Sequence, residues 1–401
     1  MNLYAYNPTW PRHEAIQAQA RRWHKRGLLT PEQLGAIEAA FPLEFYRPHL
    51  FLRIGLFLFT TLGALFAAGF AGVLAQFHFL GTLLPVLLVG GVTLELVIAG
   101  KHLYHSGADN ALLYLELLGL VVLIFDLTFA HLNEYGYADH LDPTPGTLRL
   151  ALALLLTLAV LVLATLRYAD RLVAAAAYLC ALLLFANGVL MLPLGTLLLP
   201  FALSAASAGA HAWATRQLAR PERLPYHRCL RVLRALTLGT AYLAVNYLVV
   251  REGNAELLSS GNWTGPAPQI PRAPLFYGLT AGIPVFYLVQ GLRRPDRTWL
   301  WLGLLTAAFS VYTLRYYRSV LPPETAAVLA GVLLAGGAAW ATRYLRHSRH
   351  GLTSTPDDAE DPQLNLESLI VAETAHAAPA PAETFQFGGG SSGGGGATGE
   401  Y

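Results

Sequence analysis

Three acidic residues stand inside long apolar runs of this sequence, where charged side chains are rare. Glu95 and Glu116 lie in two successive runs, and Asp126 lies ten residues after Glu116. A charged group inside a bilayer costs several kcal/mol unless it is paired or hydrated. Glu95, Glu116 and Asp126 therefore form the candidate intramembrane polar site.

We expect Glu95 and Glu116 to face each other. Each lies six residues from the inner boundary of its run, about 9 Å at 1.5 Å per residue. The short connection predicts antiparallel neighbouring helices, and Gly91 and Gly119 would allow a close approach. Two carboxylates in one apolar site cannot both ionise cheaply, so the pair would share a proton or bind a cation.

The alternative is that each acid hydrogen-bonds to a different helix. Carboxylates that face a shared cavity would favour transport, whereas carboxylates tied to neighbouring helices would favour a scaffold.

No other motif in the sequence indicates a chemical reaction. No nucleophile elbow, phosphate-binding loop, HExxH or dinucleotide fingerprint occurs in a suitable context. His102 and His105 have a spacing that could hold a metal, but without a nearby carboxylate we expect interfacial histidines. The two cysteines, Cys180 and Cys229, imply no disulfide framework. The sequence therefore gives no support to an enzyme and predicts no cofactor and no metal.

Composition indicates the surroundings of these residues. Hydrophobic residues make up 54% of the chain and charged residues 13%, and the mean hydropathy is +0.44. Soluble domains carry about 25% charged residues. The fold class is therefore all-α, a polytopic integral membrane protein whose first partner is the lipid bilayer. No basic tract with interleaved aromatics is present, so nucleic acid is not expected as a partner.

Ten membrane-spanning helices are predicted, each near the roughly 20 residues that a bilayer requires. Their approximate cores are 54–75, 79–100, 110–131, 148–166, 172–192, 194–214, 231–250, 273–291, 298–314 and 323–342. With both termini in the cytoplasm, 22 of the 27 Lys and Arg residues fall on the inner side. Whether the fifth and sixth helices both span fully is left open, since little more than Pro193 separates them.

The chain divides into three parts by composition. Residues 1–49 are predicted to form a short cytosolic helical hairpin, 50–345 the transmembrane helical domain, and 346–401 a disordered, low-complexity cytosolic tail rich in Gly and Ser. The tail is read as flexible, with binding through its aromatic end as the alternative.

The hairpin is predicted from capping signals. An amphipathic helix over 12–26 ends at Gly27, which tolerates a left-handed backbone. A second helix begins at Pro31, with Thr30 and Gln33 as a capping box. We expect the hairpin core to contain Trp23, Leu34 and Ile37.

The run from Trp23 to Gln33 resembles a bacterial family of membrane proteins, domain of unknown function 2157. Its pattern is a Trp, a Gly-Leu-Ile-Thr-like turn, a Glu-Gln pair and then many membrane helices. Residues 14–75 carry the resemblance best, and Leu29 departs from the usual Ile. The resemblance implies an N-terminal hairpin before membrane helices in a bacterial inner membrane, and it implies no catalytic residues.

Two hypotheses about function remain. The first is a membrane scaffold or sensor that contacts a protein partner through the hairpin or the tail. The alternative is a small-solute or ion/proton-coupled transporter that uses the intramembrane carboxylates. Small-residue ridges, such as Gly63, Ala67 and Ala71, could also serve a homo-oligomer.

Overall fold

Every regular element in the described part of the chain is a helix, as predicted. The computed structural model describes residues 4–46, 48–76, 78–130, 144–259, 267–293 and 296–317, with scattered positions between 325 and 344. The predicted tail and most of the predicted span 323–342 lie outside the described residues. The fold class is therefore all-α, without strands in these ranges.

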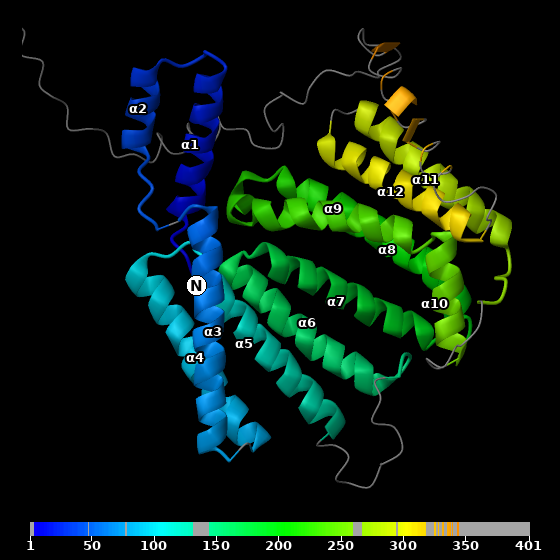
Figure 1. The fold of residues 1–401 in the computed structure, drawn as a ribbon, viewed down its shortest axis with the longest axis horizontal. Coiled ribbons are helices and arrows are strands. Elements are labelled where there is room, and N and C mark those ends of the chain that lie inside the picture. The colour runs from blue at the N-terminus through cyan, green and yellow to red at the C-terminus, as the bar shows by residue number, and fades with distance from the viewer. Residues whose placement is uncertain are drawn as a thin grey trace, which may run out of the picture.

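Twelve α-helices and two irregular helical turns follow one another along these ranges (Figure 1). The α-helices are α1 (Thr9–Lys25), α2 (Pro31–Ala40), α3 (Leu50–Leu74), α4 (Phe79–Lys101), α5 (Ala108–Phe125), α6 (Leu148–Tyr168), α7 (Arg171–Leu190), α8 (Gly195–Leu218), α9 (His227–Leu243), α10 (Tyr247–Ser259), α11 (Ala273–Arg293) and α12 (Arg297–Tyr317). A π-helical turn (Asp126–Ala130) extends α5, and a 3-10 turn (Pro221–Tyr226) precedes α9.

Seven of these helices are long and apolar enough to cross a membrane: α3, α4, α5 with its π-helical turn, α6, α7, α8 and α11. The segments Pro221–Leu243 and Tyr247–Leu257 pass the same test together, but they are bent by 73° and would make an eighth span only as one broken helix. The predicted span 231–250 is thus interrupted at residues 244–246. The fifth and sixth predicted helices are separate, and each is long enough to span.

Neighbouring helices pack in sequential pairs. α3 contacts α4 and α5, α6 contacts α7, α8 contacts α9, and α11 contacts α12 (Figure 1). Glycines allow some of these approaches. A Cβ at Gly303 of α12 would stand 2.9 Å from a Leu288 methyl of α11, and one at Gly119 of α5 would stand 2.8 Å from a Leu87 methyl of α4. Larger residues at Gly119 and Gly303 would push these helix pairs apart.

The predicted hairpin is present, with the predicted caps. Thr30 Oγ1 accepts from the Gln33 N–H, and the Gln33 side chain accepts from the Thr30 N–H. Gly27 has a φ of +73°, the left-handed conformation expected of a residue that ends a helix.

The N-terminal segment, up to the first turn of α1, is part of the main core. Tyr6 and Trp10 are buried in one cluster with Leu94 of α4 and Leu113 of α5. The Ala5 N–H also donates to the carbonyl of Arg167 at 2.7 Å. The start of the chain is thereby fixed to the ends of the apolar helices.

Candidate functional site

Glu95 is held by the end of α6. Its carboxylate accepts from the Arg167 guanidinium at 2.7 Å and 2.6 Å, one bond to each oxygen, and from the Tyr168 hydroxyl at 2.6 Å. The side chains of Glu95 and Arg167 are each 41% exposed, on a surface that lipid would cover. A bidentate Arg–carboxylate pair is the strongest arrangement available to an acid in such a place.

Glu116 lies elsewhere on the α4–α5 contact. Its carboxyl group rests against Gly90, where an added Cβ would stand only 1.6 Å from Glu116 Oε1. The helices are neighbours, as predicted, but Gly90 and not Gly91 makes the approach, because nothing lies within 4 Å of a Cβ at Gly91. No hydrogen bond joins Glu116 to another described residue.

The structure therefore gives Glu95 a different partner from the predicted one. The carboxylate of Glu95 is paired with Arg167, and Glu116 contacts α4 at Gly90, five residues before Glu95. Asp126 lies apart from Glu95 and Glu116, because it begins the π-helical turn that follows the C-terminal end of α5. The three acids of the candidate intramembrane polar site are thus three separate positions.

The hairpin residues singled out from the sequence are only half-buried. Trp23, Leu34 and Ile37 have intermediate exposure. The buried side chains of α1 are Trp10, Pro11, Ile16, Gln17 and Ala20. Gln17 Nε2 donates to the carbonyl of Phe41 at 2.8 Å, so a hydrogen bond as well as apolar contact joins the two arms.

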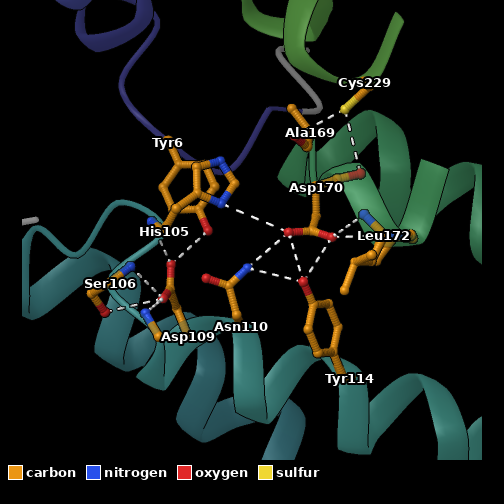
Figure 2. Close-up of polar contacts among 12 residues, drawn as sticks. Tyr6, His105, Ser106, Asp109, Asn110, Tyr114, Ala169, Asp170, Leu172 and Cys229 are labelled. Atoms are coloured by element: carbon orange, nitrogen blue, oxygen red, sulfur yellow. Dashed lines mark hydrogen bonds and ion pairs between the residues drawn. The ribbon is translucent and has the colours of Figure 1, made fainter. Parts of the chain in front are cut away.

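A buried polar cluster that the sequence analysis did not predict lies where the N-terminal segment meets α5 and α7 (Figure 2). Asp109, in the first turn of α5, accepts five hydrogen bonds. The donors are the hydroxyls of Tyr6 and Ser106 and the backbone N–H groups of His105, Ser106 and Gly107, at 2.9–3.2 Å. Carboxylates are favourable at helix N-termini because the N–H groups there are unpaired and carry partial positive charge.

Asp170 likewise accepts hydrogen bonds from backbone N–H groups at the start of α7. Its side chain accepts from the N–H groups of Leu172 and Val173 at 2.8 Å and 3.1 Å. It also accepts from Asn110 Nδ2 at 2.8 Å and from the Tyr114 hydroxyl at 3.0 Å, both on α5 (Figure 2). Asp170 therefore caps one helix and ties it to another.

Asn110 has one unsatisfied atom. The side chain is 5% exposed, and its Oδ1 has no hydrogen-bond partner among the described residues. Exchange of the amide atoms would put Oδ1 against the carboxylate of Asp170, so the orientation is fixed by that bond. A buried carbonyl left in this way weakens the cluster by about 1–3 kcal/mol unless water reaches it.

His105 is buried in this cluster, which corrects the expectation of an interfacial histidine without a carboxylate. Its Nδ1 lies 3.9 Å from Asp170 Oδ2, and its ring packs on Tyr104 and Tyr6. Burial lowers the pKa of His105 from 6.5 to about 4, against the opposing effect of Asp109 and Asp170. The imidazole is therefore neutral at pH 7. Burial also raises the pKa of Tyr6 well above its usual range.

Two further contacts close the cluster from α9. Cys229 Sγ donates to the carbonyls of Ala169 and Asp170 at 3.0 Å and 3.3 Å. Arg228 forms an ion pair with Glu14 of α1. Four segments far apart in sequence thus meet here: residues 5–14, the α4–α5 loop, the α6–α7 loop and the start of α9.

Local patterns for this cluster exist in the sequence. Ser106 and Asp109 form a Ser-x-x-Asp motif before an apolar run, and Asp170 stands directly between two apolar runs. Both patterns predict helix N-termini. That the two termini meet is a property of the tertiary fold and has no local signal.

The arrangement is that of a connector. Asp109 and Asp170 are saturated with protein donors, and no group of three or more His, Cys, Asp or Glu side chains in the described residues could hold a metal. Comparison of the chain with protein-family models, with curated proteins and with solved structures found no match.

Proposed function

We propose that this chain is a scaffold or sensor of the bacterial inner membrane, with the hairpin as its cytosolic interaction element. The observation that carries the proposal is the ion pair of Glu95 with Arg167, together with the hydrogen bond that Tyr168 donates to Glu95. A carboxylate committed to a neighbouring helix serves packing, whereas a carrier needs one that exchanges ligands. The buried cluster supports the same view, because it fixes the base of the hairpin to the helical bundle.

The proposed topology has ten spans and both termini in the cytoplasm. Seven apolar helices support most of it. The broken pair of α9 and α10, α12 and residues 323–342 would supply the remaining three. Reporter fusions after residues 140, 225, 262 and 350 test it, and a periplasm-active fusion at 225 or 350 would defeat it. The resemblance to domain of unknown function 2157 is proposed on the Trp23–Gln33 motif alone.

Flux measurements test the scaffold proposal against transport. In proteoliposomes under an imposed pH or sodium gradient, we expect no flux above protein-free vesicles for the wild type, Glu95→Gln or Glu116→Gln. A flux that the wild type supports and Glu116→Gln abolishes would overturn the scaffold proposal.

Proton- or cation-coupled transport is the second candidate, and Glu116 is the residue that favours it. This acid lies in an apolar helix and has no hydrogen bond to another described residue. A transporter built on it would lose activity in Glu116→Gln and keep it in Glu95→Gln, because only Glu95 is committed to an ion pair.

A further inference from the structure

The outer end of the hairpin carries a basic surface. Residues 21–28, here called the basic tip, contain four Arg or Lys residues, and the whole stretch 15–31 contains no Asp or Glu. Arg21, Arg22, Lys25 and Arg26 are exposed. Leu28 is 67% exposed beside them. Arg21 also pairs with Glu38 of α2 at 2.7 Å.

The basic tip points away from the apolar helices. α1 starts at Thr9, next to the buried Trp10, and runs for 17 residues, about 25 Å at 1.5 Å per residue. Figure 1 shows the turn between α1 and α2 beyond the N-terminal end of α3, at the end of the hairpin farthest from the bundle. Because α3 is a candidate span, the tip stands clear of the lipid that would surround it.

The C-terminal part of the chain has the opposite charge. Residues 351–401 contain eight Asp or Glu residues and no Lys or Arg. Four of the acids fall within 357–361, and Leu364, Leu366, Leu369 and Ile370 follow directly. The acidic residues of 357–371 are therefore complementary in charge to the basic tip, and the apolar residues of the same segment can contact the exposed Leu28.

We propose that segment 357–371 of this chain binds the basic tip of the hairpin. The inference rests on the proposed topology, in which both ends share one side of the membrane. Asp357 lies 13 positions after Tyr344, and an extended chain of that length reaches about 45 Å. Tethering gives an effective concentration near the millimolar range, so a weak electrostatic contact is enough. A partner of the hairpin would then have to displace the tail.

Two spin labels on the full-length protein in nanodiscs test the contact. The native thiols, Cys180 and Cys229, are both buried, so Leu28→Cys and Leu366→Cys can be labelled selectively. We expect a population of short distances between the labels. It should fall at least about threefold when salt is raised to 1 M, where the screening length is about 3 Å.

Charge reversal supplies the specific test. The triple variant Arg22→Glu, Lys25→Glu, Arg26→Glu should abolish the short distances. Adding Asp357→Lys, Asp358→Lys and Asp361→Lys should restore them. The matched control keeps the wild-type tip and carries Glu373→Lys, Glu383→Lys and Glu400→Lys. These substitutions change the tail charge equally but lie outside the proposed segment, so they should leave the short distances in place.

The contrary outcomes are distinct. Labels that react from opposite sides of the membrane would overturn both the topology and the tail contact. Labels on one side without short distances, or short distances that survive charge reversal, would overturn the contact alone. Short distances between singly labelled chains, or a tip that binds anionic vesicles equally with and without the tail, would show a second copy or lipid as the occupant and would also overturn it.

Discussion

Arg167 at the end of α6 binds both carboxylate oxygens of Glu95 on α4, which joins two helices that are 72 residues apart in sequence. A neutral partner on either side would leave the other charge uncompensated at a half-exposed position among apolar helices. A charged residue near the centre of a membrane helix costs about 3 kcal/mol on insertion scales, and less toward the ends.

The double substitution at this pair should therefore cost less than the two single substitutions added together. We expect Glu95→Gln and Arg167→Gln each to lower the free energy of unfolding by about 2 kcal/mol, and the double variant to lose less than their sum. Denaturant unfolding in detergent micelles measures the cycle. Additive losses would mean that the two side chains do not stabilise one another.

Gly90 and Gly91 form a matched pair of test sites. A Cβ at position 90 would collide with Glu116, whereas nothing lies near position 91. Gly90→Ala should displace the Glu116 side chain and cost about 1–2 kcal/mol, and Gly91→Ala should be close to neutral. Glu116→Ala should relieve the effect of Gly90→Ala. Thermal unfolding of the wild type, the three single variants and the Gly90→Ala/Glu116→Ala double variant measures this, and equal effects at positions 90 and 91 would place Glu116 elsewhere.

Asp170 should be the most sensitive residue of the buried cluster. Asp170→Ala removes the cap of α7 and leaves Asn110 Nδ2 and the Tyr114 hydroxyl without their acceptor. We expect a loss of about 3 kcal/mol or more. Tyr114→Phe removes only one donor and should cost about 1 kcal/mol, which makes it the control. Similar losses for both variants would show that Asp170 does little beyond accepting from Tyr114.

Stability should fall in acid because of His105. The unfolded chain protonates this residue near pH 6.5, but the folded protein holds its pKa at about 4. The unfolded state thus binds more protons between these values, and the folded state loses up to roughly 3 kcal/mol as pH falls from 6.5 to 4. His105→Asn should remove that part of the pH dependence, since Asn tolerates the φ of +50° at this position. Parallel unfolding curves of both proteins from pH 7.5 to 4.5 would contradict this assignment.

Trp10 should matter more to the N-terminal segment than Trp23. Trp10 is 5% exposed and packs on Phe45 and Tyr104, whereas Trp23 is half-buried. We expect Trp10→Ala to lower the protection of residues 5–45 by about 3–5 kcal/mol and Trp23→Ala to do so by less. Amide hydrogen exchange on both variants measures this, and a larger effect at Trp23 would restore it as the hairpin core.

Periodic and local features could be predicted from the sequence. The apolar runs predict the helices from α3 to α8 within a few residues, and the capping box at Thr30 and Gln33 predicts the start of α2. These features depend only on residues close in sequence.

The pairings could not be predicted. Glu95 and Glu116 have matching depths, but a nearby guanidinium is a better partner for a carboxylate than a second carboxylate. Nothing local indicates that Arg167 lies beside Glu95. The break between α9 and α10 was missed for a related reason. Asn246 caps α10 and bonds to Thr313, so a contact 67 residues away helps to interrupt an apolar run.

The ion pair between Glu14 and Arg228 has a consequence for synthesis of the chain. The two residues are 214 positions apart, and a ribosome adds roughly 5–20 residues per second. For about 10–40 seconds the emerging hairpin thus lacks the α9 residue that completes its attachment to the bundle. During that interval the N-terminal segment is held by its contacts with α4, α5 and α6, and its attachment is complete only after α3–α8 have been made.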